Sequence, residues 1–76
     1  MWIRSQDKKI LTEIHDVEID SANQIWGSGS LIGEYSTEEK ALKVLDYIHS
    51  ILDANEWDIS DLRVVFEMPA DKDVEV

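Results

Sequence analysis

The chain has 76 residues, no cysteine and a formal net charge of −10, from 17 acidic and 7 basic side chains. This length fits a single small domain covering residues 1–76, and the lack of cysteine excludes disulfides and thiolate zinc sites. The negative charge disfavours direct binding to nucleic acid or to an anionic membrane, and it favours a basic protein partner. A chain this short buries only about 60% of its unfolded surface, so we expect it to form a homo-oligomer.

No apolar run approaches the ~18 residues that a membrane-spanning helix needs. The first residues also lack the basic segment and apolar run of a signal peptide. These patterns predict a cytoplasmic protein. With only two histidines, we expect no metal site and no cofactor.

The first part of the chain is predicted to form short strands. Residues 2–5 form the first strand, with Trp2 and Arg4 on one face, and the polar residues 6–9 form a turn. Residues 10–19 form a second strand whose apolar alternation changes phase at His15–Asp16. Strict alternation does not absorb a shift of one residue, so a bulge or a tight turn is expected there.

A hairpin and a helix are predicted to follow. Residues 24–26 and 31–35 pair around Gly27-Ser28-Gly29-Ser30, whose glycines permit the positive φ of a tight turn. Gly33 indicates a bulge or the close approach of another group. Ser36 is the expected helix N-cap, completing a capping box with Glu39. The helix then runs to about residue 55 with one broad apolar face.

The last strand is expected over residues 62–68, and Pro69 ends it. Residues 70–76 form an acidic tail that we expect to be frayed. Strands followed by one amphipathic helix and a further strand predict an α+β fold. In this fold, a small antiparallel β-sheet carries the helix packed on one face.

Two stretches resemble a known family: residues 1–9, Met-Trp-Ile-Arg-Ser-Gln-Asp-Lys-Lys, and residues 31–48, which contain a Gly-x-Tyr-x-(Ser/Thr)-x-Glu-x-Ala pattern. The family consists of small uncharacterised proteins of Gram-positive bacteria and their phages that begin with a Trp-Ile-Arg-Ser-Gln strand. Residues 10–30 and 55–76 fall outside the match. The resemblance implies a phage or mobile-element context, in which small acidic proteins often counter host defence. If a phage encodes the chain, the expected location is the cytoplasm of the host cell.

The first candidate site is rich in cations for so acidic a chain. Arginine gives bidentate phosphate contacts, and tryptophan gives a stacking platform for a base. A second tryptophan beside the Gly-Ser-Gly turn could close over the same ligand. The candidate ligand-binding residues are Trp2, Arg4, Ser5, Gln6, Lys8, Lys9 and Trp26. The alternative is that the tryptophans pack on the sheet, Arg4 pairs with an acid, and the turns are only turns.

Two other groups of residues suggest less specific chemistry. His15 and His49 lie near acids, but solvated surface charges explain them better than catalysis does, so we expect no enzyme. The acids at 13, 16, 18 and 20 could imitate phosphates in a basic groove, or could only solvate one face. Trp57 and Ile59, ringed by acids, are candidate residues of a protein interface.

These patterns lead to three alternatives for function. The first is a non-catalytic, phage-type counter-defence protein that sequesters a small anionic nucleotide signal in an oligomer. The second is an acidic protein that blocks a basic, nucleic-acid-binding surface of a host defence protein. The third is a small structural or interaction module with no role in defence.

Overall fold

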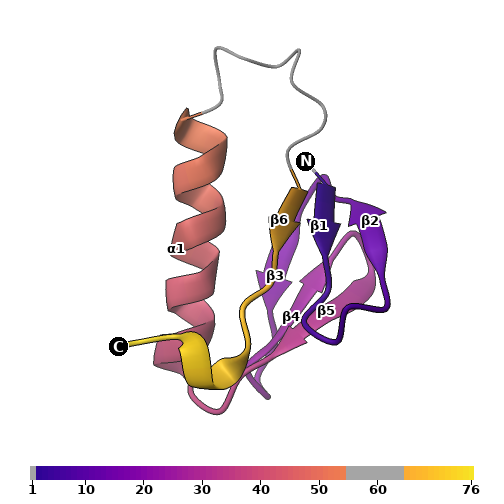
Figure 1. Ribbon diagram of the computed structural model, residues 1–76. Helices are drawn as coiled ribbons and strands as arrows, with labels where there is room; N and C mark the ends of the chain where they lie inside the picture. Colours follow the sequence, from indigo (N-terminus) through magenta and orange to yellow (C-terminus); the bar gives the residue numbers. More distant parts are fainter. Residues whose placement is uncertain (1, 55–64) are drawn as a thin grey trace.

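The computed structural model describes residues 2–54 and 65–76 (Figure 1). The elements are short, and most strands have only three residues. In chain order they are β1 (Trp2–Arg4), β2 (Leu11–Glu13), β3 (Val17–Ile19), β4 (Gln24–Gly27), β5 (Ser30–Glu34), α1 (Glu38–Ala54), β6 (Val65–Glu67) and the 3-10 turn η1 (Asp71–Asp73).

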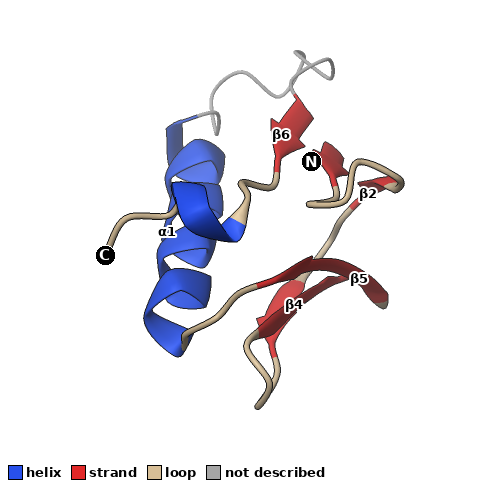
Figure 2. Ribbon diagram, turned by 60° about the horizontal axis from the view of Figure 1, so that its bottom comes forward, coloured by secondary structure: helices blue, strands red, loops and turns tan. Residues whose placement is uncertain are grey.

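The strands form two three-stranded sheets beside the helix (Figures 1 and 2). The first sheet has the order β2-β1-β6, and the second has the order β3-β4-β5. The predicted α+β class is confirmed. The arrangement differs from the expected single antiparallel sheet in two ways, because the strands form two sheets and β6 runs parallel to β1. β2, the hairpin partner of β1, pairs along one edge of β1. β6, which follows the helix in the sequence, therefore pairs along the other edge.

The single strand predicted over residues 10–19 is wrong, because the fault expected at His15–Asp16 lies between two strands of different sheets. β2 ends at Glu13, and β3 begins at Val17 in the second sheet. The backbone amide of His15 donates to Ser28 Oγ at 2.9 Å, and the Ser28 amide donates to the Asp16 carbonyl at 3.2 Å. The phase change in the sequence therefore marks the point where the chain passes from one sheet to the other.

The predicted hairpin is also confirmed. Its two-residue turn is Ser28–Gly29, with φ of 47° and 86°, which suits the twist of the flanking strands. The pairing shifts between Ile25 and Trp26, where β5 bulges. Gly33 lies beside this bulge, and a Cβ built there would meet Tyr35 Cε2 at 2.9 Å. Both expectations for Gly33, a bulge and a close approach, are therefore confirmed.

The helix begins one residue later than its predicted cap implies. Thr37, not Ser36, is the N-cap, because Thr37 Oγ1 accepts a hydrogen bond from the Lys40 amide at 3.1 Å. The amide of Ser36 donates instead to Asp71 Oδ1 at 2.8 Å. The predicted capping box is therefore wrong, because the amide of Ser36 that it requires is bonded to Asp71 near the C-terminus.

The expectation of a frayed acidic tail is wrong for the segment around η1. Lys40 Nζ donates to the Asp71 carbonyl at 3.0 Å and lies 3.4 Å from Asp71 Oδ2. The hydrogen bond from the Ser36 amide is the main cause that lowers the pKa of Asp71. Val74 is buried in the core. These contacts tie the tail to the start of the helix, where Figures 1 and 2 show η1 beside α1.

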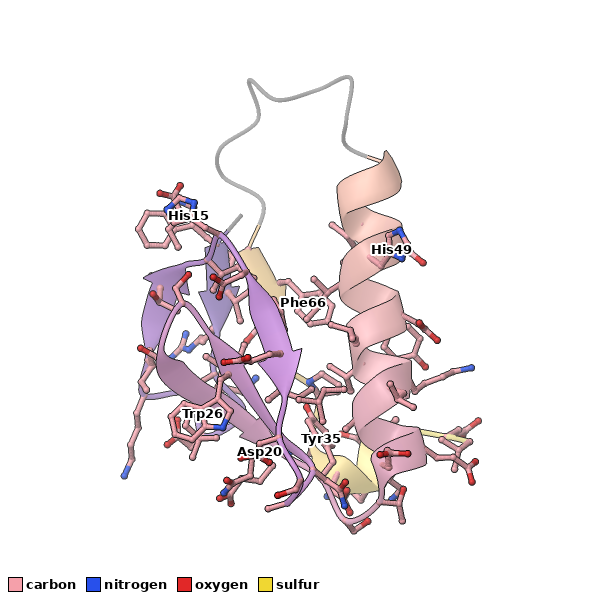
Figure 3. The ribbon with its side chains drawn as sticks, turned by 180° about the vertical axis from the view of Figure 1, so that it is seen from behind. His15, Asp20, Trp26, Tyr35, His49 and Phe66 are labelled. Atoms are coloured by element: carbon pink, nitrogen blue, oxygen red, sulfur yellow. The ribbon has the colours of Figure 1, made fainter. Side chains whose placement is uncertain are left out.

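The core lies between the helix and the two sheets. Tyr35 closes one end of it, and its hydroxyl donates to the Pro69 carbonyl at 2.8 Å. Burial raises the pKa of Tyr35, and the nearby charge of Asp71 adds to this effect. Phe66, from β6, packs against the same core (Figure 3). The buried apolar residues are Ile3, Ile14, Ile25, Ile32, Tyr35, Ala41, Val44, Ile48, Met68 and Val74.

Candidate functional site

The solvent side of the first sheet carries a mixed apolar and charged surface, which we call the outer face. Alternation along each strand sends Ile3 and Phe66 toward the core and their neighbours outward. The register places Trp2 beside Glu13 and Val65, and Arg4 beside Leu11 and Glu67. The outer face thus consists of Trp2, Arg4, Leu11, Glu13, Val65 and Glu67.

Three large apolar side chains of the outer face are exposed. Trp2 is 36% exposed, Leu11 is 60% exposed and Val65 is 42% exposed. They come from three adjacent strands, so they are neighbours on one surface. Single exposed apolar residues need no explanation, but a group that includes a tryptophan is typical of a binding surface.

The cations of the predicted ligand site are engaged in local contacts. Arg4 Nε and Nη2 both donate to the Lys8 carbonyl, at 3.2 and 3.1 Å. Lys8 has a φ of 69°, and its Nζ forms a salt bridge with Glu67 Oε1 at 3.1 Å. Arg4 and Lys8 therefore hold the turn between β1 and β2 and connect it to β6. Lys9 is exposed and lies close enough to Asp7 to help lower the pKa of Asp7.

Ser5 and Gln6, also predicted to bind a ligand, stabilise the fold. Ser5 is buried, and its hydroxyl donates to Asp7 Oδ1 at 2.6 Å, which is the main cause that lowers the pKa of Asp7. Gln6 Nε2 donates to the carbonyl of Glu34 at 3.0 Å, and Gln6 Oε1 accepts from the amide of Glu34 at 2.9 Å. A cavity of about 300 Å³ lies beside both residues, but Asp7 and Glu34 contribute to its lining. Two carboxylates disfavour an anionic ligand there.

Trp26 does not join the N-terminal residues. It lies in the second sheet (Figure 3), where its Nε1 donates to Asp20 Oδ2 at 2.9 Å. The other oxygen of Asp20 accepts the amides of Ala22 and Gln24, each at 2.9 Å. The hydrogen bond from Trp26 is the main cause that lowers the pKa of Asp20. Asp20 therefore stabilises a turn, and three of the hydrogen bonds that its carboxylate can accept are made within the chain.

The two histidines border a common cavity, which sequence reasoning did not expect. His15 lies at the break between the sheets and His49 lies on α1 (Figure 3). Both line about 290 Å³ of mainly apolar space. The other lining residues are Ile14, Asp16, Val17, Leu45 and Ile48. Within residues 2–54 and 65–76, no cluster of three or more His, Cys, Asp or Glu side chains could hold a metal ion.

Sequence reasoning missed Leu11 and Val65. The alternation that places Glu13 on the outer side of β2 also places Leu11 there, so a signal was present. Val65 follows from the same rule applied to β6, since Phe66 points to the core. The predicted interface residues Trp57 and Ile59 lie outside the described residues.

Comparisons with known proteins give no relative. No family model, no curated protein and no solved structure matches the chain. The resemblance at residues 1–9 and 31–48 therefore stays a prediction. Among the described residues, no helix has the length and apolar character needed to cross a membrane.

Proposed function

We propose that the chain is a non-catalytic protein-binding module whose contact surface is the outer face. The observation that carries this proposal is the exposure of Trp2, Leu11 and Val65 on adjacent strands of one sheet. Tryptophan is enriched among the residues that dominate binding energy, and apolar neighbours exclude water around it. Main-chain pairing fixes these three positions relative to one another, so little ordering is needed on binding.

The partner proposed for this surface is a protein with an apolar centre and a basic rim. The chain carries a net charge of −10, which steers basic partners toward it and repels nucleic acid. Glu13 and Glu67 lie on the outer face beside the apolar residues. This proposal includes the counter-defence alternative, in which the module covers a basic, nucleic-acid-binding surface of a host defence protein.

Sequestration of a nucleotide has less support. Arg4 and Lys8 already bind groups of the chain itself, and the polar cavity beside Ser5 is lined by Asp7 and Glu34. Trp26 lies in the other sheet and donates its ring N–H to a carboxylate. Calorimetry with cyclic nucleotides separates the two proposals, and we expect no heat of binding.

A comparative pull-down tests the protein-binding proposal. The tagged chain is incubated with extract of a Gram-positive bacterial host, and each captured protein is then compared between variants. Trp2→Ala should weaken capture of the true partner by at least about tenfold, since such anchors contribute about 2 kcal/mol or more. Tyr47→Ala is the matched control, because Tyr47 is 39% exposed but lies on the helix.

Salt provides a second criterion in the same experiment. Capture should fall as ionic strength rises, because long-range attraction to a basic partner is screened. Circular dichroism of each variant checks that the fold is kept. Equal capture by Trp2→Ala and Tyr47→Ala would exclude the outer face as the contact surface.

A further inference from the structure

Strand β2 is an edge of the first sheet with one partner, β1. Among the described residues, no backbone hydrogen bond links β2 to any strand other than β1. Leu11, at the start of β2, is 60% exposed, and no proline or bulge interrupts β2. Edge strands with this character are templates for pairing with another chain.

The ladder defines which backbone groups of β2 point outward. The Ser5 amide donates to the Ile10 carbonyl at 2.8 Å, so Ser5 and Ile10 are a hydrogen-bonded pair. Antiparallel pairs alternate between bonded and non-bonded. Ile3 and Thr12 are therefore the next bonded pair, and the amides and carbonyls of Leu11 and Glu13 point away from β1.

The charged side chains along the edge of one copy are complementary to those along the same edge of a second copy. Lys9 and Glu13 are both exposed, and each is two residues from Leu11. Within the described residues, neither side chain takes part in a salt bridge. If two copies of the edge pair antiparallel with Leu11 opposite Leu11, each Lys9 stands opposite the Glu13 of the other copy. A slip of one residue in either direction removes both charge pairs.

We propose that the chain forms a two-fold symmetric dimer in which β2 pairs with β2 of a second copy, centred on Leu11. The outward amide and carbonyl of Leu11 bond reciprocally across the axis, in agreement with the direction of the ladder. The Lys9 amide already donates to Asp7 Oδ1 at 3.0 Å within its own chain. At each end of the paired segment, the remaining bond is therefore from the Glu13 amide of one copy to the Lys9 carbonyl of the other copy. The two sheets become one, and the two outer faces become one continuous surface.

This inference does not depend on the proposed function, because a dimer forms whether or not the outer face binds a further protein. The contact is small, and interfaces below about 1,200 Å² are typical of weak complexes. Sedimentation equilibrium should therefore cover about 10 μM to about 1 mM of the whole chain at low salt. We expect a monomer–dimer equilibrium with no larger species.

Charge reversal tests the register. Lys9→Glu places two acids opposite each other at both ends, and Glu13→Lys places two bases there. Each variant should weaken dimerisation by about tenfold or more, because opposite-charge pairs stabilise a sheet and like charges destabilise it. Mixing the two variants should restore association as a heterodimer, because each Glu then faces a Lys. The double variant Lys9→Glu with Glu13→Lys should form a homodimer again.

Two further variants complete the test. Lys72→Glu changes net charge by the same amount as Lys9→Glu, but Lys72 lies in η1, so dimerisation should change much less. Leu11→Pro removes an amide that points away from β1, so the fold is kept while dimerisation is lost. A chain that stays monomeric at 1 mM, or a dimer that is not restored by mixing the charge variants, would overturn the proposal.

Discussion

Replacing Gly33 by alanine tests the packing at the bulge of β5, because two effects of opposite sign compete there. Gly33 is not among the positive-φ residues, so alanine adopts its backbone conformation without strain. On that ground alone the substitution should stabilise the fold by about 0.4–1 kcal/mol, through the entropy of the unfolded chain. The new methyl group, however, meets Tyr35 Cε2 at 2.9 Å and Met68 Cε at 3.1 Å.

The clash should decide whether the substitution stabilises or destabilises the fold. Met68 Cε is the end of a flexible side chain and can move, but the Tyr35 ring is buried and its hydroxyl is held by the Pro69 carbonyl at 2.8 Å. Overpacking of this kind costs about 1–3 kcal/mol. We expect Gly33→Ala to be less stable by about 1–2 kcal/mol, which lowers Tm by about 5–15 °C for a domain of this size.

Thermal unfolding followed by circular dichroism measures this change. A double-mutant cycle then assigns its cause, since Gly33→Ala should cost at least about 0.5 kcal/mol less when Tyr35 is already alanine. A stability equal to or above that of the parent chain would refute the reasoning. So would a cost that is the same in both backgrounds.

Three further predictions concern single hydrogen bonds. Tyr35→Phe removes the donor to Pro69 and should cost about 1 kcal/mol in urea unfolding at neutral pH. The pKa of Tyr35 is raised in the folded chain, so its contribution is complete below about pH 10 and is lost as pH rises further. The stability difference between the two chains should shrink there. Thr37→Ala should lower stability by about 1 kcal/mol in the same assay, and Ser36→Ala by clearly less, because Thr37 is the N-cap. The pKa of Asp71 is lowered from 3.8, so its contribution is present above that pH and lost as pH falls. Acid titration of Asp71→Asn should show a smaller loss of stability below about pH 5 than the parent chain shows.

Local sequence signals predicted those parts of the fold that depend on neighbouring residues. The phase change at His15–Asp16 predicted an irregularity at the position where the chain passes between the sheets, although one strand was expected there. The glycines of residues 27–30 located the hairpin turn. The helix followed from its apolar spacing. In each case the pattern and the structure that it predicts lie within a few residues of each other in the chain.

Contacts between distant residues account for the errors. Ser36 has the residue type of an N-cap, but its amide bonds to Asp71, 35 residues away. The tail looked frayed because its composition is acidic, while its order depends on Lys40 and on the buried Val74. Neither contact is visible from spacing, because each depends on where the end of the chain returns.

Only part of the candidate site was predictable, because the other part depends on contacts between residues that are distant in the sequence. Alternation alone places Trp2 and Arg4 on one face, and the structure agrees. Finding Leu11 and Val65 beside them requires the register of β2 and β6 against β1. The parallel pairing of β6 was not expected, so the apolar part of the outer face could not be assembled from the sequence.

The cations that first suggested a phosphate site have a different role in the fold. Three of the seven basic residues fall between positions 4 and 9, but Arg4 and Lys8 use their donors on the turn and on β6. Of these two, only Lys8 is paired with an acid among the described residues, because Arg4 donates to the neutral carbonyl of Lys8. The outer face therefore keeps the charge of Arg4 beside the apolar side chain of Leu11. Lys9 is the one of the three that has no such contact among the described residues, and the only acid opposite it in a paired edge is Glu13 of a second copy. Lys9 takes part only in the proposed dimer and Trp2 only in the proposed partner contact, whereas Leu11 and Glu13 belong to both surfaces. Lys9→Glu and Trp2→Ala are therefore the variants that separate dimerisation from partner binding.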